Sequence, residues 1–323
     1  MHYRTLSLGI LTIFAAASTA CVVDDGAFDD GAAEDSGLGD DDDDNDDDDD
    51  NDDDDDNDDA TAFDGPRIRV LLDVDPDQVR VDSFGQPAPH PPAGHAALSP
   101  DFLVIGAHSA ELVPHEFTLL GGGEQLFDSE HRDDAVDFDD LPRVSPGDEL
   151  WSGPRSALAP GTYKYLRLSV SYQQFRVPGT ASFAGNAITT PIEIVSVVES
   201  KMYIDSYDIG DDTVDVDGVV EQGYFGAWSQ YTGVTQGQAP VGSTTVPNPL
   251  NATSPIPVTS CVVAAVLDPP LVITGDEDDD LTFNITMSTN DSFEWIDDGD
   301  GKWQPLSEPV VDMGLRGMLV EVK

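Results

Sequence analysis

The sequence predicts an all-β protein: an antiparallel β-sandwich that follows a disordered acidic N-terminal tether. Two observations favour this fold class. From residue 66 onward, short alternating or apolar runs recur between clusters of Gly, Pro, Asn and Asp, as strands separated by turns do. No run of ten or more residues shows helical spacing with capping residues. Frequent turns between mostly sequential strands favour a sandwich over a closed barrel or an α/β fold.

Residues 1–20 are expected to be a secretory signal peptide. They begin with a short basic region that contains Arg4, continue through an apolar core and end in small residues. This segment is too short to span a bilayer permanently as a helix. Cys21 follows Ser18-Thr19-Ala20 in an arrangement that resembles the lipobox of bacterial lipoproteins, which implies lipidation of Cys21. A plain signal-peptidase cut after Ala20 remains the alternative.

The residues after Cys21 indicate a destination. Val22 stands where, by resemblance to Gram-negative lipoproteins, an Asp would retain the protein at the inner membrane. We therefore expect an exported outer-membrane lipoprotein that contacts the membrane through its lipid anchor, since several acyl chains together hold a protein permanently. The acidic run from Asp24 onward also resembles surface-export signals of some bacterial lipoproteins, which implies display at the cell surface.

Residues 21–64 are expected to form a disordered tether. Residues 40–59 contain seventeen aspartates, arranged as repeated DDDDDN hexads. Adjacent carboxylates repel one another, and the run offers no apolar side chain to bury. The hexads would bind calcium only diffusely, because no glycine allows a turn that converges six or seven oxygen atoms. We interpret the tether as a spacer that lifts the folded domain off the envelope.

The charge of the chain limits its partners. The formal net charge is −50, and residues 65–323 alone hold 40 acidic and 13 basic side chains, a charge of −27. Such a field repels nucleic acid and anionic headgroups, so the expected ligand is neutral or cationic. Calcium or high external salt would relieve the self-repulsion, and adaptation to a saline habitat is an alternative explanation for the charge.

Residues 65–323 are expected to form one β-sandwich domain. Six motifs follow one another along residues 66–323: GAHSAELVPHEFTLLGGG, LAPGTYKYLRLSVSYQ, GQAPVGSTTVPNPL, TSPIPVTSCVV, FEWIDDGDGKW and EPVVDMGLRGM. Together they resemble an uncharacterised family of β-rich bacterial surface and outer-membrane lipoproteins. The resemblance implies a mode of anchoring and a fold class, and it implies no catalytic residue. Residues 232–257 lack a strand pattern and are expected to form either a long loop or a sub-domain boundary.

Two local patterns make finer predictions. In YKYLRLSVSY, Arg167, Ser169 and Ser171 alternate with apolar residues, which predicts a half-buried strand with one dry and one wet face. Cys261 lies in an apolar run and is expected to be a buried thiol within a strand. With only two cysteines in the chain, a disulfide framework is excluded.

The segment DDGDGKW is the best candidate for a metal site. Asp297, Asp298 and Asp300 flank glycines, as in oxygen-rich calcium loops where carboxylates and carbonyls converge. The segment departs from the EF-hand pattern, because Ser307 stands where the terminal Glu is expected. Asp297 or Glu308 would compensate in a looser loop, and calcium is the only expected cofactor.

Histidines suggest a second metal site. All five histidines after the signal peptide fall between His90 and His131. His108, Glu111 and His115 are candidate ligands for a transition metal, because imidazole is the commonest ligand of zinc and copper. An HExxH motif is absent, since Leu119 stands four residues after His115, and surface or loop histidines are the alternative.

Two functional hypotheses follow. The first is a non-enzymatic cell-envelope lipoprotein that displays a calcium-tolerant β-sandwich off the outer membrane and binds a neutral or cationic ligand. The alternative is a secreted metal-dependent enzyme that uses the His90–His131 histidine cluster. The sequence contains no GxSxG, GxxxxGK or GxGxxG motif.

Overall fold

The computed structural model describes residues 65–81, 87–132, 135–183, 186–198, 201–221, 224–238 and 261–323. The predicted signal peptide, the lipidation site Cys21 and the acidic tether lie outside these residues. The described part contains no helix with the length and hydrophobicity needed to span a bilayer.

The predicted fold class is confirmed. Of the described residues, 65% lie in strands and 1% in a helix. That helix is a single 3-10 turn, η1 (Arg155–Ala157). Most strand pairs are antiparallel, as expected.

The largest sheet is built around one long strand, β9 (Gly161–Phe183). Its order is β14-β13-β10-β9-β3-β4, with β15 also pairing with β9 and β7 with β3. The first half of β9 pairs with β15 and its second half with β10, while β3 runs along its other edge. The other strands of this sheet are β3 (Asp101–Val113), β4 (Glu124–Asp128), β7 (Arg143–Val144), β10 (Asn186–Val197), β13 (Tyr224–Ser229), β14 (Gly233–Gln238) and β15 (Val262–Ile273).

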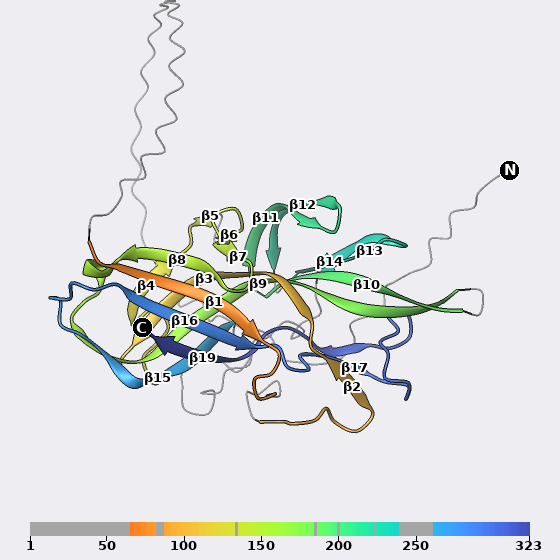
Figure 1. Ribbon diagram of the computed structural model, residues 1–323. Coiled ribbons are helices and arrows are strands. Elements are labelled where there is room, and N and C mark those ends of the chain that lie inside the picture. The colour runs from red at the N-terminus through yellow and green to blue at the C-terminus, as the bar shows by residue number, and fades with distance from the viewer. Residues whose placement is uncertain are drawn as a thin grey trace, which may run out of the picture. The chain divides into compact units, whose positions relative to one another are not determined.

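A second sheet packs against this central sheet. Its order is β19-β16-β1-β8, made by β1 (Arg67–Asp75), β8 (Asp148–Pro154), β16 (Leu281–Ser288) and β19 (Arg316–Val322). Figure 1 shows β1, β16 and β19 lying across β3, β9 and β15. The pair β1–β16 is parallel and departs from the expected antiparallel arrangement.

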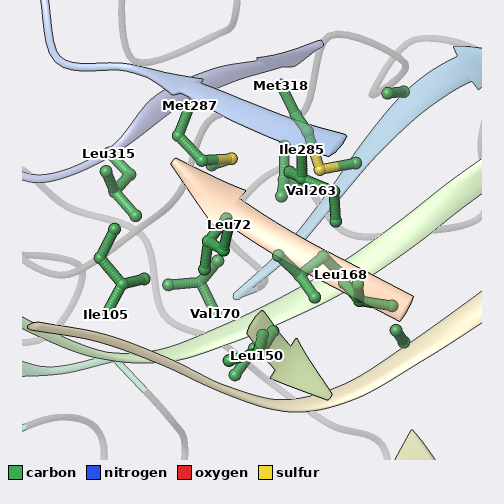
Figure 2. Close-up of a cluster of buried hydrophobic side chains, with 14 of the residues drawn as sticks. Leu72, Ile105, Leu150, Leu168, Val170, Val263, Ile285, Met287, Leu315 and Met318 are labelled. Carbon is green, nitrogen blue, oxygen red and sulfur yellow. The ribbon is translucent and has the colours of Figure 1, made fainter. Parts of the chain in front are cut away.

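The main hydrophobic core fills the space between these two sheets. Figure 2 shows Leu72 of β1 and Ile285 of β16 facing Leu168 of β9, with Val263 of β15 beside them. These side chains are fully buried. Along β1, the buried residues Ile68, Val70 and Leu72 alternate with more exposed ones, as successive residues of a strand point to opposite faces.

Two smaller sheets complete the domain. The sheet β12-β11-β6-β5 contains β5 (His131–Arg132), β6 (Ala135–Asp137), β11 (Lys201–Ile209) and β12 (Asp212–Glu221). It shares a second core with Tyr172 of β9 and Val195 of β10. The sheet β18-β17-β2 contains β2 (His95–Leu98), β17 (Phe293–Ile296) and β18 (Val310–Asp312).

The prediction that one face of β9 is exposed to solvent is wrong. Arg167, Ser169 and Ser171 are all buried. Arg167 is covered by the β3–β4 loop (residues 114–123), and Ser169 Oγ lies 3.0 Å from Cys261 Sγ. Alternation identifies residues that share a face of a strand, but it does not reveal that other segments cover that face.

Two further predictions, for Cys261 and for residues 232–257, can be compared with the structure. Cys261 is buried, as expected, but it lies immediately before β15 and not within a strand. Residues 233–238, which show no strand pattern, nevertheless form β14 because they pair with every residue of β13 in a hairpin. The remainder of the predicted loop or boundary, from residue 239 onward, lies outside the described residues.

Candidate functional site

The predicted calcium residues come together in the loop between β17 and β18. Carboxylate oxygens of Asp297, Asp298, Asp300 and Glu308 all lie within 4.8 Å of one another. Gly299 and Gly301 have φ values of 107° and 69°, which non-glycine residues rarely adopt, so the glycines allow the loop to fold back on itself. We call these four residues the acidic cluster.

Backbone hydrogen bonds fix two of the aspartates of the acidic cluster. Gly301 N donates to Asp297 Oδ1 at 2.9 Å, and Lys302 N donates to Asp300 Oδ1 at 2.8 Å. Each aspartate keeps its second oxygen free of these backbone bonds. The loop is therefore shaped before any ion binds.

Glu308 supplies the acidic group missing from the sequence pattern. Its side chain is 4% exposed. Asp298 N donates to Glu308 Oε1 at 2.8 Å, and Gln304 N donates to Glu308 Oε2 at 2.7 Å. Because both oxygens accept backbone N–H groups, a carboxylate is tolerated at this buried position.

The acidic cluster has the chemistry of a hard-cation site. Calcium takes six to eight oxygen ligands from carboxylates, carbonyls and water in flexible geometry. Four negative groups this close repel one another, and a bound divalent cation would remove that repulsion. Gln304 Nε2 lies 3.4 Å from both Asp298 Oδ2 and Asp300 Oδ2.

An apolar pocket of about 130 Å³ adjoins the same loop. Trp303, Pro305 and Leu306 form one wall. The β9–β10 hairpin and the β13–β14 hairpin supply the others. The lining residues from these hairpins, from β18 and from the residue after it are Gly179, Thr180, Ala181, Thr190, Ile192, Ile194, Phe225, Ala227, Trp228, Ser229, Tyr231, Thr232, Thr235, Val310 and Met313.

Close packing joins the pocket wall to the acidic cluster. Trp303 Nε1 donates to Glu308 O at 3.2 Å, and Thr180 N donates to Trp303 O at 2.8 Å. The Trp303 ring packs edge-on against Phe293 at 4.8 Å between centroids. Residues 303–308 therefore contribute Glu308 to the acidic cluster and Trp303, Pro305 and Leu306 to the pocket wall.

A glycine on β9 leaves room for this arrangement. A Cβ at Gly179 would overlap the Ile192 side chain and lie 3.1 Å from Pro305 Cγ. Any larger residue at this position would displace a wall of the pocket.

Behind the pocket, Glu193 ties β10 to its neighbours. Its Oε1 accepts hydrogen bonds from Gln174 Nε2 at 2.7 Å and from Gly210 N at 2.8 Å, and its Oε2 accepts one from Arg176 Nε at 2.9 Å. Burial acts to raise the pKa of Glu193, but these hydrogen bonds and the Arg176 charge outweigh it, and the pKa lies below its usual value. The adjacent residues Ile192 and Ile194 line the pocket.

The structure does not bring the predicted transition-metal ligands together. Among the described residues, His108, Glu111 and His115 do not form a group of ligand atoms at metal-binding separation. Glu111 Oε1 instead accepts a hydrogen bond from Arg167 Nη1 at 2.7 Å, and Glu111 Oε2 accepts one from Gly123 N at 3.1 Å. His108 Nδ1 is hydrogen-bonded to Ser171 Oγ at 2.6 Å.

Two of the other histidines, His95 and His131, lie in different surroundings. His95 forms an ion-pair contact with the buried Glu294. His131 and His108 line one polar cleft of about 260 Å³, together with Asp128 and the Glu111–Arg167 pair. His108 and His131 thus share one cleft with Glu111, whereas His95 does not line it.

Sequence reasoning missed the apolar pocket. Its walls come from four segments of the chain that only the strand pairing brings together. Little in the sequence indicates the pocket. Tyr231 and Leu306 line it and are exposed, but single apolar residues in turns are common in any sequence. Comparisons with protein-family models, with curated proteins and with solved structures gave no match to this chain.

Proposed function

We propose that residues 65–323 are a non-enzymatic binding domain whose ligand places an apolar group in the pocket beside the acidic cluster. The observation that carries this proposal is the pocket itself, a preformed hollow with almost entirely apolar walls. Ligand sites are typically concave and apolar, with a few polar groups at their margins.

The volume of the pocket and the net charge of the domain define the class of ligand. An apolar cavity of about 150 Å³ holds a benzene molecule, so 130 Å³ suits one aromatic ring or a short branched alkyl group. The −27 charge of residues 65–323 opposes anions. The ligand is therefore a neutral or cationic molecule that presents one such apolar group.

We further propose calcium as the ion of the acidic cluster. Support comes from the four converging carboxylates and from the backbone hydrogen bonds that hold them in place. The ion would stiffen residues 297–308 and so fix the Trp303 wall of the pocket.

The proposed setting is the cell envelope. Support comes from the sequence of residues 1–64, with Cys21 as the lipidated residue and the aspartate run as a spacer. An outer-membrane lipoprotein displayed at the cell surface would present the domain to ligands outside the cell.

The competing enzyme hypothesis has less support. It requires the histidine cluster to leave an open coordination position on a metal. Glu111, a predicted ligand, already accepts hydrogen bonds from Arg167 and Gly123 through both oxygens.

Filling the pocket tests the binding proposal. Ala227 lines the pocket, and Ala227→Phe would occupy its volume. Benzene or indole, titrated as probes, is expected to change the fluorescence of Trp228 and Trp303 saturably in the parent protein and not in this variant. Val272→Phe, at an exposed position of β15, serves as the matched control. Equal probe binding by the parent and Ala227→Phe, with both folded by thermal melt, would refute the assignment of the pocket.

A further inference from the structure

The apolar pocket lies beside an unprotected edge of the largest sheet. β14 pairs with β13 along one side, and its other side has no strand partner in the part of the chain that the structure describes. Exposed sheet edges usually carry charged side chains or proline, which discourage pairing with other chains. The edge strands β8, β12 and β19 of the other sheets each contain Asp or Glu, whereas β14 (GVTQGQ) contains no charged residue and no proline. The main chain of β14 is therefore open to an added strand.

One face of β14 belongs to the pocket. Thr235 lines the pocket, as does Ala227, which lies directly opposite it in the β13–β14 register. Tyr231, in the turn between these strands, and Leu306 also line the pocket, and with exposures of 66% and 73% they mark its open side. Side chains of an added strand that point to the same face as Thr235 would therefore lie at the mouth of the pocket.

The opposite face of β14 lies against the β11–β12 hairpin. Gln236, the residue after Thr235, points to this face because successive residues of a strand alternate. Its Nε2 donates to Asp215 O at 3.5 Å, and Trp228 Nε1 donates to Asp212 Oδ2 at 2.9 Å. Asp212 and Asp215 belong to β12 and are exposed. Carboxylates therefore stand beside β13 and β14 on the face away from the pocket.

The charge around this edge is of one sign. Residues 202–238, which include most of β11 and all of β12, β13 and β14, contain seven acidic residues and no Lys or Arg. Such a concentration of negative charge attracts cationic partners and repels anionic ones.

We propose that the ligand of the pocket is a segment of a cationic polypeptide that adds to the edge of β14 as an extended strand. This inference rests on the proposed function of the pocket and specifies its ligand. In this mode of recognition, main-chain hydrogen bonds to the edge strand give affinity, and pockets for alternate side chains give specificity. One apolar side chain of the segment enters the pocket, and its two neighbours, Lys or Arg, point to the acidic β12 face.

A second copy of this chain is a poorer occupant of the same edge. Pairing of two β14 strands would bring together two domains that each carry −27, with their acidic hairpins side by side. A small apolar molecule would fill the pocket but would leave the edge of β14 unpaired.

Peptide binding by the full-length chain tests the inference. The protein carries Cys21→Ala, so that no acyl chain is attached, and binding is followed by the fluorescence of Trp228 and Trp303 at the pocket. The probe is acetyl-TKTKFKTK-amide, which places Phe on one face of a strand and every Lys on the other. The control is acetyl-TTKKFTKK-amide, which has the same composition but mixes the faces. Both carry four positive charges, so diffuse binding to the aspartate run affects them equally.

The alternating peptide should bind at least about tenfold more tightly than its isomer, a difference of about 1.4 kcal/mol. Ala227→Phe, which fills the pocket, should remove this preference. Asp212→Asn/Asp215→Asn should weaken binding of the alternating peptide about fivefold at low salt. The matched control is Asp276→Asn/Asp278→Asn, which removes two exposed carboxylates from the β15–β16 turn and should leave binding unchanged.

Two methylated peptides test the pairing of the main chain. Only alternate residues of an added strand direct their N–H groups to the neighbouring strand. N-methylation of Phe in one peptide, and of the next Lys in another, should therefore abolish binding in one case and leave it nearly unchanged in the other.

Equal binding of the two isomers, or equal effects of the two methylated peptides, would overturn the inference. Saturable binding of benzene or indole in that case would leave the pocket as a site for a small molecule. Loss of the peptide preference together with absence of benzene and indole binding would instead refute the pocket itself.

Discussion

Arg167 and Glu111 form an ion pair on adjacent strands of the central sheet, with Nη1 of the arginine 2.7 Å from Oε1 of the glutamate and both side chains buried. The two residues lie directly opposite each other in the β3–β9 register. The pair connects the core of the domain to the β3–β4 loop, because the same guanidinium binds three loop carbonyls.

We predict that Arg167→Met destabilises the domain by about 3–5 kcal/mol, because it leaves the Glu111 carboxylate buried without its partner. Urea denaturation followed by tryptophan fluorescence would measure the loss. The double variant Arg167→Met/Glu111→Leu should recover part of it, since no buried charge remains, but the loop carbonyls stay without donors. If Arg167→Met alone is as stable as the parent, solvent must reach this ion pair.

Calcium should raise the melting temperature of the protein. At a hundredfold excess over Kd, one bound ion adds about 2.7 kcal/mol to the free energy of unfolding. The aspartate run of residues 40–59 should first be removed, because its diffuse binding would mask a single site. Asp298→Asn/Asp300→Asn should abolish the effect. A rise that survives both substitutions, or that magnesium reproduces equally, would indicate general screening of charge.

The stability of the domain should depend on the ionisation of Glu193. Its pKa is lower in the folded protein than in the unfolded chain, so its contribution is complete above about pH 4.5 and is lost as the pH falls through the folded pKa. Glu193→Gln should therefore be less stable than the parent at pH 7, and the difference should shrink towards pH 3. Denaturation at a series of pH values would measure this. A difference that stays constant with pH would contradict the role of charge at Glu193.

Cys21→Ala should release the protein from membranes into the soluble fraction. Acyl chains at Cys21 would provide a permanent anchor, and the described residues contain no helix that could span a membrane in their place. Fractionation of cells grown with a labelled fatty acid would measure both the release and the loss of label. Label retained by this variant would refute lipidation at Cys21.

Local pattern was sufficient to predict the fold class and part of the candidate site. Short alternating or apolar runs between turn residues predict strands, and one such run, RIRVLLDV, forms most of β1. The spacing of Asp297, Asp298 and Asp300 around two glycines also predicts a turn that gathers carboxylates. These predictions succeed because the relevant residues are neighbours in the chain.

Predictions that depend on distant segments were less successful. The polar face of β9 reads as exposed because nothing near Arg167 in the sequence shows that residues 116–119 cover it. The pocket was missed for the same reason, since Gly179, Ala227 and Trp303 meet only after β10 has paired with both β9 and β13 and the loop that carries Trp303 has packed against β9. Glu111 looked like a metal ligand because its partner, Arg167, lies 56 positions away.

The parallel pairing of β1 with β16 has a consequence for how the chain folds. Arg67 N donates to Asp280 Oδ1 across 213 positions, and the register then runs from Ile68–Leu281 to Asp75–Ser288. Contacts between such distant positions slow folding, because a long segment must be ordered before they form. The pairing of β1 with β16 can therefore be completed only after residue 288 is available. For the export proposed above, in which the chain would cross the membrane unfolded, β1 would remain without its β16 partner until residue 288 has crossed.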